Sequence, residues 1–331
     1  PQFVLSTLLE RYRSKRILWH RDAVLNALWE MIPIRDLSSL LERGLDYVKE
    51  EAGLALPKTR NSRLDQLDLS LMASLAAKLY PQPQQFAVKH LMVDEMQDLT
   101  LWQHSFIERL FDCPKTVLGD PHQALLYLPM GDYLQNLVTA YGGDEKVSFH
   151  AFHIAYRSSW EISEFSKRLV DADDEEIISL ERYVDPVTVI ISDEPEESLL
   201  NDFMTKEVDA ITYAILCSNE DEAEELQDVA EQLGTPELKR KLDFDSTETQ
   251  YVVMTPEEAR GMEFDAVWIY APKLPALDDA ARRRALYVAA TRALHELTLV
   301  TTEPREKLEE MGFDLNSDYA QLIEEEANDE N

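Results

Sequence analysis

Carboxylates cluster directly after the apolar stretch "HLMV" at residues 90–93. Asp94 and Glu95 come first, and a second short stretch, "KTVLG", leads to another acidic residue and then to Gln123. Because ligands of open parallel sheets lie beyond the carboxyl ends of the strands, we expect both groups at one edge of a sheet. Asp94 could hold Mg²⁺ directly or through water, Glu95 could orient or deprotonate an attacking water, and Gln123 could contact a terminal phosphate.

A capping role competes for part of this cluster. Asp98 and Thr100 stand immediately before "LWQHSFIERL", where a helix N-cap is expected. A cap accounts for one of these carboxylates, so a Mg²⁺ site formed by the others remains open as an interpretation.

Strands and helices that alternate along the chain must position these residues. Apolar residues at helical spacing predict a helical segment over residues 1–85. Beyond it, alternation favours an α/β protein with parallel sheets. The predicted strands are 90–95, 115–120, 187–192, 210–218, 251–255, 266–271 and 296–302, and the predicted helices are 101–111, 132–143, 158–170, 219–234 and 282–294. We expect the acidic end, residues 324–331, to be frayed.

The charge is strongly acidic and unevenly spread. The formal net charge is −32, yet residues 1–64 hold 11 Lys and Arg against 8 Asp and Glu, and residues 65–331 hold 21 against 56. Such acidity opposes a broad duplex-binding surface and suits a partner with a basic surface, although it also fits a merely solvated surface. The short acidic runs at 171–177 and 193–197 have no assigned role.

Cysteine content and hydropathy bound the class of protein further. The chain has 2 Cys, which excludes a disulfide framework and a Cys-based metal site. It has no apolar run of the roughly 18 residues that a membrane span requires. We therefore expect a cytoplasmic protein with no membrane partner.

Five motifs occur in the order found in one family of motors. "VDEMQD" at residues 93–98 resembles the DExQD form of the Walker B motif of superfamily 1A helicases, the UvrD/Rep type. "LGDPHQ", "AYRSSWEI", "ARGMEFDAVWIY" and "LYVAATRALHELTLV" resemble their motifs III, IV, V and VI. The wording of the last two is most similar to the HelD branch, related to helicase IV, whose members act on RNA polymerase. The resemblance covers residues 90–300 and implies ATP and Mg²⁺ as cofactors.

The resemblance also implies roles for individual residues. Catalytic roles fall on Asp94, Glu95, Gln123, Arg157 and Arg292, with Asp94 and Glu95 as the Mg²⁺ and water-activating carboxylates and the two arginines neutralising phosphate charge in the transition state. Nucleotide-binding roles fall on Gln97, which couples to the γ-phosphate, Tyr156, which stacks on adenine, Glu263, which meets the ribose, and Gly261, which allows close approach.

Some of these residues could instead have a purely structural role. Arg157 could form a surface ion pair and Tyr156 could belong to the core. The basic run Arg282, Arg283 and Arg284 is not assigned to a site. Two positions depart from the family pattern: Tyr127 stands one place late after motif III, and Arg260 replaces the usual Lys before the Gly of motif V, which keeps the charge but changes the geometry.

A phosphate-binding loop is missing from the sequence. A P-loop requires GxxxxGK[ST], and none of the 9 glycines precedes a GK pair. We therefore expect a fragment that lacks the Walker A motif and, measured alone, has negligible ATPase activity. Between the helix ending at Gly234 and the strand starting at Tyr251 there is no room for the 2B domain of UvrD-type motors, which also favours the HelD branch.

These observations predict a P-loop NTPase-class fold with RecA-like lobes. The expected domains are a helical segment at 1–85, a partial first lobe at 86–152 and a second lobe at 153–331. Three functions are weighed: the C-terminal motor portion of a HelD-like ATPase that remodels or recycles RNA polymerase, a fragment of an ordinary 3′→5′ DNA helicase that binds single-stranded nucleic acid, and a non-catalytic scaffold derived from such a motor.

Overall fold

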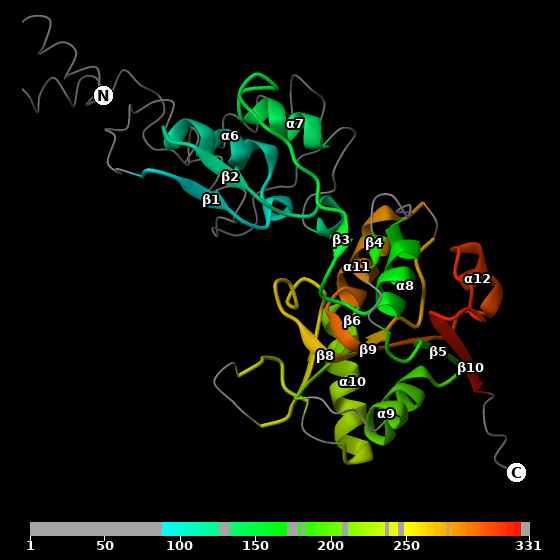
Figure 1. Ribbon diagram of the computed structural model, residues 1–331. Coiled ribbons are helices and arrows are strands. Elements are labelled where there is room, and N and C mark those ends of the chain that lie inside the picture. The colour runs from blue at the N-terminus through cyan, green and yellow to red at the C-terminus, as the bar shows by residue number, and fades with distance from the viewer. Residues whose placement is uncertain are drawn as a thin grey trace, which may run out of the picture. The chain divides into compact units, whose positions relative to one another are not determined.

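The computed structural model describes residues 88–125, 133–170, 178–179, 183–206, 211–235, 238–243, 248–276 and 278–325. The predicted helical segment over 1–85, Tyr127 and the acidic run at 171–177 lie outside these residues. The described chain divides into two compact units (Figure 1). The first contains residues 88–93, 100–117 and 137–143, and the second contains 94–99, 118–125, 133–136 and the described residues from 144 onward.

The first unit is built around one parallel strand pair. β1 (Leu91–Val93) pairs with β2 (Lys115–Val117), and α6 (Leu101–Leu110) connects them in sequence. α6 begins at a capping box, in which the Thr100 hydroxyl accepts from the Gln103 amide at 3.2 Å and the Thr100 amide donates to the Gln103 side chain at 2.7 Å. The predicted cap is thus confirmed for Thr100, but it is wrong for the Asp98 carboxylate, which accepts from Arg260 instead.

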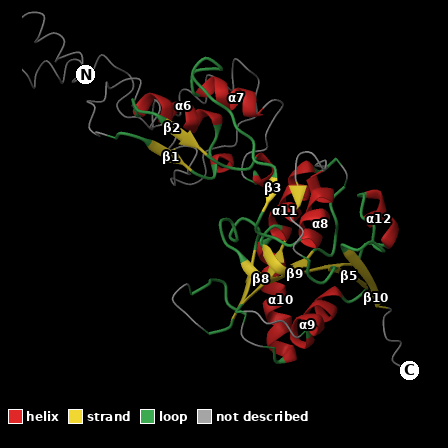
Figure 2. Ribbon diagram, viewed as in Figure 1, coloured by secondary structure: helices red, strands yellow, loops and turns green. Residues whose placement is uncertain are grey.

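The second unit contains a parallel sheet with helices packed around it (Figure 2). Its six strands are hydrogen-bonded in the order β10-β5-β9-β8-β6-β7. A further short parallel pair joins β3 to β4, and α7 (Tyr133–Ala140) precedes it in the chain. The strands are β3 (Ile154–Ala155), β4 (Ile178–Ser179), β5 (Val187–Ser192), β6 (Thr212–Cys217), β7 (Gln250–Met254), β8 (Phe264–Tyr270), β9 (Ala293–Thr301) and β10 (Ala320–Glu325). The predicted α/β class with parallel sheets is confirmed.

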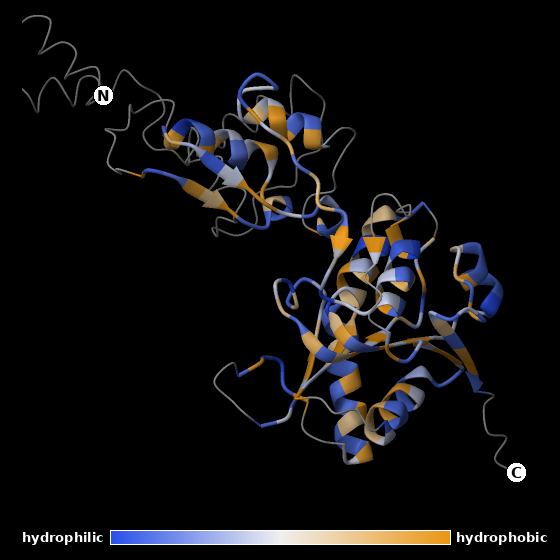
Figure 3. Cartoon of the chain, in the orientation of Figure 1, coloured by the Kyte–Doolittle hydropathy of each residue, from blue (hydrophilic) through white to orange (hydrophobic). Residues whose placement is uncertain are grey.

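Helices cover both faces of this sheet. α8 (Trp160–Val170), α11 (Ala280–Ala290) and α12 (Arg305–Glu310) contribute to one apolar cluster, and α9 (Pro195–Thr205) and α10 (Glu220–Leu233) contribute to the other. The strands β6 and β8 are therefore apolar and buried over most of their length, from Tyr213 to Cys217 and from Ala266 to Tyr270, as expected for parallel strands covered on both sides (Figure 3). Trp268, in β8, is fully buried and donates from its indole N–H to Asp202 at 2.7 Å.

Two elements of the second unit differ from the sequence prediction. α9 was not predicted, and the acidic run at 193–197 proves to enter its first turn, where Glu196 and Glu197 meet the positive end of the helix dipole. The expected fraying from residue 324 is wrong for Glu324 and Glu325, because both belong to β10, which pairs with β5. A charged edge strand carries too little apolar periodicity to be recognised from sequence.

Candidate active site

The first group of predicted residues lies on a strained turn. Asp94 follows β1 directly, and Glu95 has φ 51° and ψ 50°, which makes it the single non-glycine residue of the described chain with positive φ. The Glu95 amide donates to the Asp94 carboxylate at 2.9 Å, and a short 3₁₀ helix, η1 (Met96–Asp98), follows. Both carboxylates are exposed. A left-handed glutamate costs energy and persists only where the surroundings fix it.

The buried side chain of Gln97 holds this turn in place. Its side chain is buried, at 4% exposure, and donates to the Glu95 carboxylate at 2.6 Å. Its carbonyl oxygen accepts the Asp120 amide at 3.0 Å, and the Met96 amide donates to the Leu118 carbonyl at 2.8 Å. The two polar turns predicted to follow neighbouring strands are thus joined through a buried amide.

Arg292 completes the chain of contacts. It lies between α11 and β9, is 4% exposed, and donates to the Gln123 side-chain oxygen at 2.7 Å. Gln123 in turn donates to the Asp120 carboxylate at 3.1 Å. Two further donations, to the carbonyls of Val288 at 3.1 Å and Met262 at 3.3 Å, hold the guanidinium in place. A continuous path of hydrogen bonds therefore links Arg292 to Glu95.

The electrostatics of Arg292 show which charges surround it. Burial lowers the pKa of its guanidinium, and the nearby positive charge of Arg157 lowers it further, whereas the negative charges of Glu95 and Glu263 raise it. A guanidinium keeps its proton at neutral pH in proteins. The site therefore places one buried cation within the field of two carboxylates, and such a cation can stabilise negative charge that develops on a bound phosphate.

A second predicted pair lies at the surface. Arg157 contacts Glu263 at 3.0 Å, with its side chain 75% exposed, so the surface ion pair weighed from the sequence is present. Tyr156 is 68% exposed, which excludes the alternative that it belongs to the core. Gly261 is exposed and has φ 70°. The predicted roles of these residues toward a nucleotide stay predictions.

Three residues of the site were not singled out from the sequence as contributors. Asp120 accepts from Gln123 and sits 3.4 Å from the Tyr287 hydroxyl, which donates to it from α11. Arg260 donates to Asp98 at 2.7 Å. Asp120 was visible as the acid that follows the second strand, but nothing local marks Tyr287 or the partner of Arg260.

The carboxylates fit a Mg²⁺ ion that is shared with a phosphate. Within the described ranges, no group of three or more His, Cys, Asp or Glu side chains could hold a metal by itself. Mg²⁺ needs only one or two carboxylates when phosphate and water supply the other oxygens, and Asp94 and Glu95 present exposed oxygens of this kind. The residues present therefore fit Mg²⁺ together with a nucleotide.

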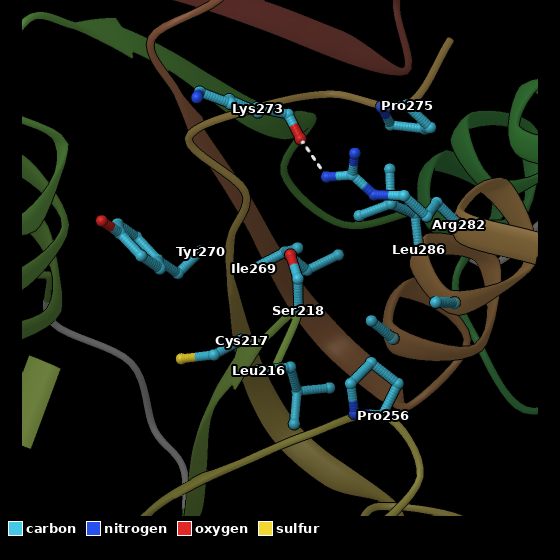
Figure 4. A pocket seen from close by; sticks show the side chains of 12 residues that line it. Leu216, Cys217, Ser218, Pro256, Ile269, Tyr270, Lys273, Pro275, Arg282 and Leu286 are labelled. Atoms are coloured by element: carbon cyan, nitrogen blue, oxygen red, sulfur yellow. Dashed lines mark hydrogen bonds between the residues drawn. The ribbon is translucent and has the colours of Figure 1, made fainter. Parts of the chain in front are cut away.

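A separate pocket lies beyond the carboxyl ends of β6 and β8 (Figure 4). Its floor is apolar, with Leu216 and Ile269 among its residues, and Ser218, Lys273 and Arg282 bring polar groups to it. Arg282 donates to the Lys273 carbonyl at 3.0 Å. The nine predicted site residues contribute nothing to its lining.

In the part of the chain that the structure describes, no helix is long and apolar enough to cross a membrane.

Comparisons place one stretch of the chain in a known family. Residues 251–300 match the model of the UvrD-like helicase C-terminal domain. Among curated proteins, none matches the chain. The C-terminal domain of a possible DNA helicase from Lactobacillus plantarum WCFS1 is similar at 21% identity and a TM-score of 0.36, over 51% of this chain and 98% of that one.

A second solved structure is the Arterivirus nonstructural protein 10 (helicase) in complex with DNA. It shares 15% identity at a TM-score of 0.38, over 83% of this chain and 54% of that one. Likenesses this weak do not bear on function. The family match covers β7, β8, α11 and most of β9, and it includes Arg260, Glu263 and Arg292. Residues 251–300 are therefore similar to a UvrD-like helicase C-terminal domain.

Proposed function

We propose that the chain is the C-terminal motor portion of a HelD-like, ATP-dependent helicase or translocase that remodels or recycles RNA polymerase. The observation that carries the proposal is the buried Arg292, which belongs to the matched stretch and is joined through Gln123, Asp120 and Gln97 to the Glu95 carboxylate. A cation and a carboxylate connected in this way suit hydrolysis of a phosphoanhydride.

Each residue has a role in this proposal. ATP, held with Mg²⁺, supplies the phosphoanhydride bond whose hydrolysis drives the motor. Asp94 and Glu95 would hold Mg²⁺ and orient the attacking water, while Gln97 fixes the Glu95 carboxylate by a hydrogen bond. Arg292 neutralises charge that develops on the transferred phosphoryl oxygens. Gln123 accepts a hydrogen bond from the same guanidinium. A phosphate bound by Arg292 would therefore also affect the turn of Gln123 and, through Asp120 and Gln97, the turn of Glu95.

The exposed residues bind the rest of the nucleotide. Tyr156 offers an exposed ring for stacking on adenine, and Glu263 offers a carboxylate for the ribose hydroxyls. In the structure Glu263 pairs with Arg157. Binding of a nucleotide therefore releases Arg157 toward the phosphates when Glu263 turns to the ribose.

The hydrolytic role is tested in the natural polypeptide that carries this sequence. We expect R292A to lower the steady-state rate of ATP hydrolysis by about 10²- to 10³-fold, the usual cost of removing a preorganised transition-state donor. R305A is a matched control, because Arg305 forms only an exposed ion pair with Glu309 in α12. Hydrolysis by R292A within about threefold of the parent would contradict the proposal.

RNA polymerase is proposed as the partner because of charge. The net charge of −32 opposes phosphate binding over a broad surface and suits the basic channels of an enzyme that itself holds nucleic acid. We expect the natural polypeptide to retain core RNA polymerase in a pull-down at about 0.15 M salt. Failure to retain it, with ATP hydrolysis intact, would leave a motor that acts on another partner.

The Lys273 pocket favours a second candidate, an ordinary DNA helicase. Two basic side chains at the carboxyl ends of parallel strands stand out in an acidic chain, and such a place suits a phosphate group. This candidate predicts tight, salt-dependent binding of a single-stranded oligonucleotide by the natural polypeptide, weakened severalfold in K273E. Binding no tighter than about 10⁻³ M would remove it, since even non-specific binding is usually stronger.

A further inference from the structure

One ion pair joins the two halves of the candidate site across 162 residues of sequence. Arg260 Nη1 lies 2.7 Å from Asp98 Oδ1, and the two side chains are 29% and 28% exposed. Arg260 also donates from Nε to the Glu257 carbonyl at 3.2 Å. Its guanidinium is therefore held at one end by its own loop and at the other by the carboxylate turn.

Asp98 is directly hydrogen-bonded to the backbone of Glu95. The Asp98 amide donates to the Glu95 carbonyl at 2.9 Å, which closes η1. Glu95 holds a left-handed conformation that its neighbours must maintain. A displacement of the Asp98 side chain therefore reaches the Glu95 backbone within a single turn.

The loop that carries Arg260 is itself well fixed. Thr255 and Glu258 cap each other, with the Thr255 amide donating to the Glu258 carboxylate at 2.9 Å and the Glu258 amide donating to the Thr255 hydroxyl at 3.3 Å. Arg240 also binds Glu258, at 3.0 Å. This loop follows β7, one of the strands of the large sheet, and so provides a rigid support for Arg260.

We propose that Arg260 is a positioning residue that, through Asp98, holds the turn of Asp94 and Glu95 in its strained conformation. The expected effect on ATP hydrolysis rests on the proposed function. The expected effect of Arg260 on the conformation of residues 94–99 does not. A purely surface ion pair contributes little and leaves distant backbone unchanged. A positioning pair controls the backbone protection of residues 94–99.

Hydrogen exchange of the natural polypeptide, without nucleotide, tests this directly. We expect R260A to speed exchange across residues 94–99 by about fivefold or more, because the bonded amides of Met96 and Asp98 lie there, while exchange in α10 stays unchanged. D98N should act like R260A. R260K keeps the charge but loses the second donor of the guanidinium, so its exchange should lie between that of the parent and that of R260A.

The control removes a different ion pair of the same loop. R240A loses the contact with Glu258 but leaves Arg260 and Asp98 intact, so exchange across residues 94–99 should not change. Exchange in R260A equal to that of the parent would overturn the inference, and so would exchange in D98N equal to that of the parent.

Hydrolysis separates this inference from the proposed function. We expect R260A to lower kcat severalfold and to change KM little, since the Arg260 side chain binds the Asp98 carboxylate and the Glu257 carbonyl. Faster exchange in R260A together with unaltered hydrolysis in R292A would retain the positioning role and reject the proposed function. Unchanged exchange in R260A together with lost hydrolysis in R292A would do the reverse.

Discussion

At the scale of single residues, Gly119 decides whether the two polar turns can touch. A Cβ atom built at Gly119 would lie 2.3 Å from the Gln97 side-chain oxygen and 2.7 Å from the Met96 amide nitrogen. The backbone of the Gln123 turn can approach the buried Gln97 only because this position has no side chain. The hydrogen bond from Asp120 to Gln97 depends on that approach.

G119A should therefore separate the two turns. We expect a loss of about 1–3 kcal/mol in the free energy of unfolding, because the nearest atoms include backbone that cannot move aside. Urea unfolding measures the loss. G312A is the control: Gly312 also has positive φ, 90°, but its added Cβ meets nothing within 4 Å, so only about 1 kcal/mol of strain is expected. Equal losses in the two variants would refute the close-approach argument.

Asp265 gives the second unit an acid-sensitive anchor. Burial by itself would raise the pKa of Asp265, but the amides of Ile211 and Thr212 and the Thr212 hydroxyl all donate to its carboxylate at 2.9 Å, and the pKa is lowered overall. A lowered folded-state pKa contributes stability that is complete above the unfolded value of about 3.9 and is lost as the pH falls through the folded value.

The variant D265N tests whether the charge of Asp265 stabilises the fold at neutral pH. We expect the variant to be less stable than the parent by about 1 kcal/mol at pH 7, since it weakens charge-assisted hydrogen bonds. The difference should narrow as the pH falls below about 4, because the parent carboxylate then becomes neutral as well. Urea unfolding at several pH values measures it. A difference that stays constant down to the acid limit would show that Asp265 acts without its charge.

At the scale of elements, capping and coverage determine where each segment begins and ends. α10 starts at Asn219, whose side chain accepts the Glu222 amide at 2.9 Å, and stops at Gly234 with φ 70°, the left-handed cap that its sequence predicts. α6 starts at Thr100 and not at Asp98. Asp98 is thereby free of a capping role and is available to Arg260.

Thr100 and Asp98 can be separated by mutation. T100A removes the hydroxyl that accepts the Gln103 amide, so α6 should lose about 1 kcal/mol of stability. Hydrogen exchange across residues 101–110 should then speed up by about fivefold. D98N should leave exchange in α6 unchanged, because Thr100 makes the cap of that helix and the Asp98 carboxylate accepts from Arg260. Faster exchange in α6 of D98N would restore Asp98 as part of the cap.

At the scale of the whole molecule, the sequence holds the motifs proposed for one half of a nucleotide site but no GxxxxGK[ST] motif. Asp94, Glu95 and Arg292 can contact an ion and phosphate oxygens, whereas tight binding of ATP also needs backbone N–H groups such as those of a P-loop. The net charge of −32 also opposes binding of free ATP, because it repels a polyphosphate unless a local cation compensates it.

Residues 1–331 alone should therefore hydrolyse ATP slowly. We expect a steady-state rate below about 1 s⁻¹, the lower end of ordinary enzyme turnover. A coupled assay for released phosphate measures it, with R292A as the control for contaminating activity. A faster rate that R292A abolishes would show that this chain forms a phosphate site of another kind.

The sequence by itself determined the class of the fold, and its motifs proposed the residues of the candidate site. Long apolar runs predict strands buried on both faces, helical spacing and the glycine at 234 set α10, and the order of the motifs names the residues that could act. These signals are local: each is carried by a few consecutive residues. The edge strand β10 was not predicted, because its acidic residues interrupt the alternation of apolar and polar residues. Its conformation is set by hydrogen bonding to β5.

Only the tertiary structure decided how the named residues meet. The contacts of Arg292 with Gln123 and of Arg260 with Asp98 span 169 and 162 residues, and no local pattern encodes a pairing at that distance. Burial of Arg292 depends on the sheet and α11 closing around it, and an arginine is buried only where such partners satisfy it. The strained backbone of Glu95 likewise follows from surroundings that act together, because its own sequence favours no left-handed turn.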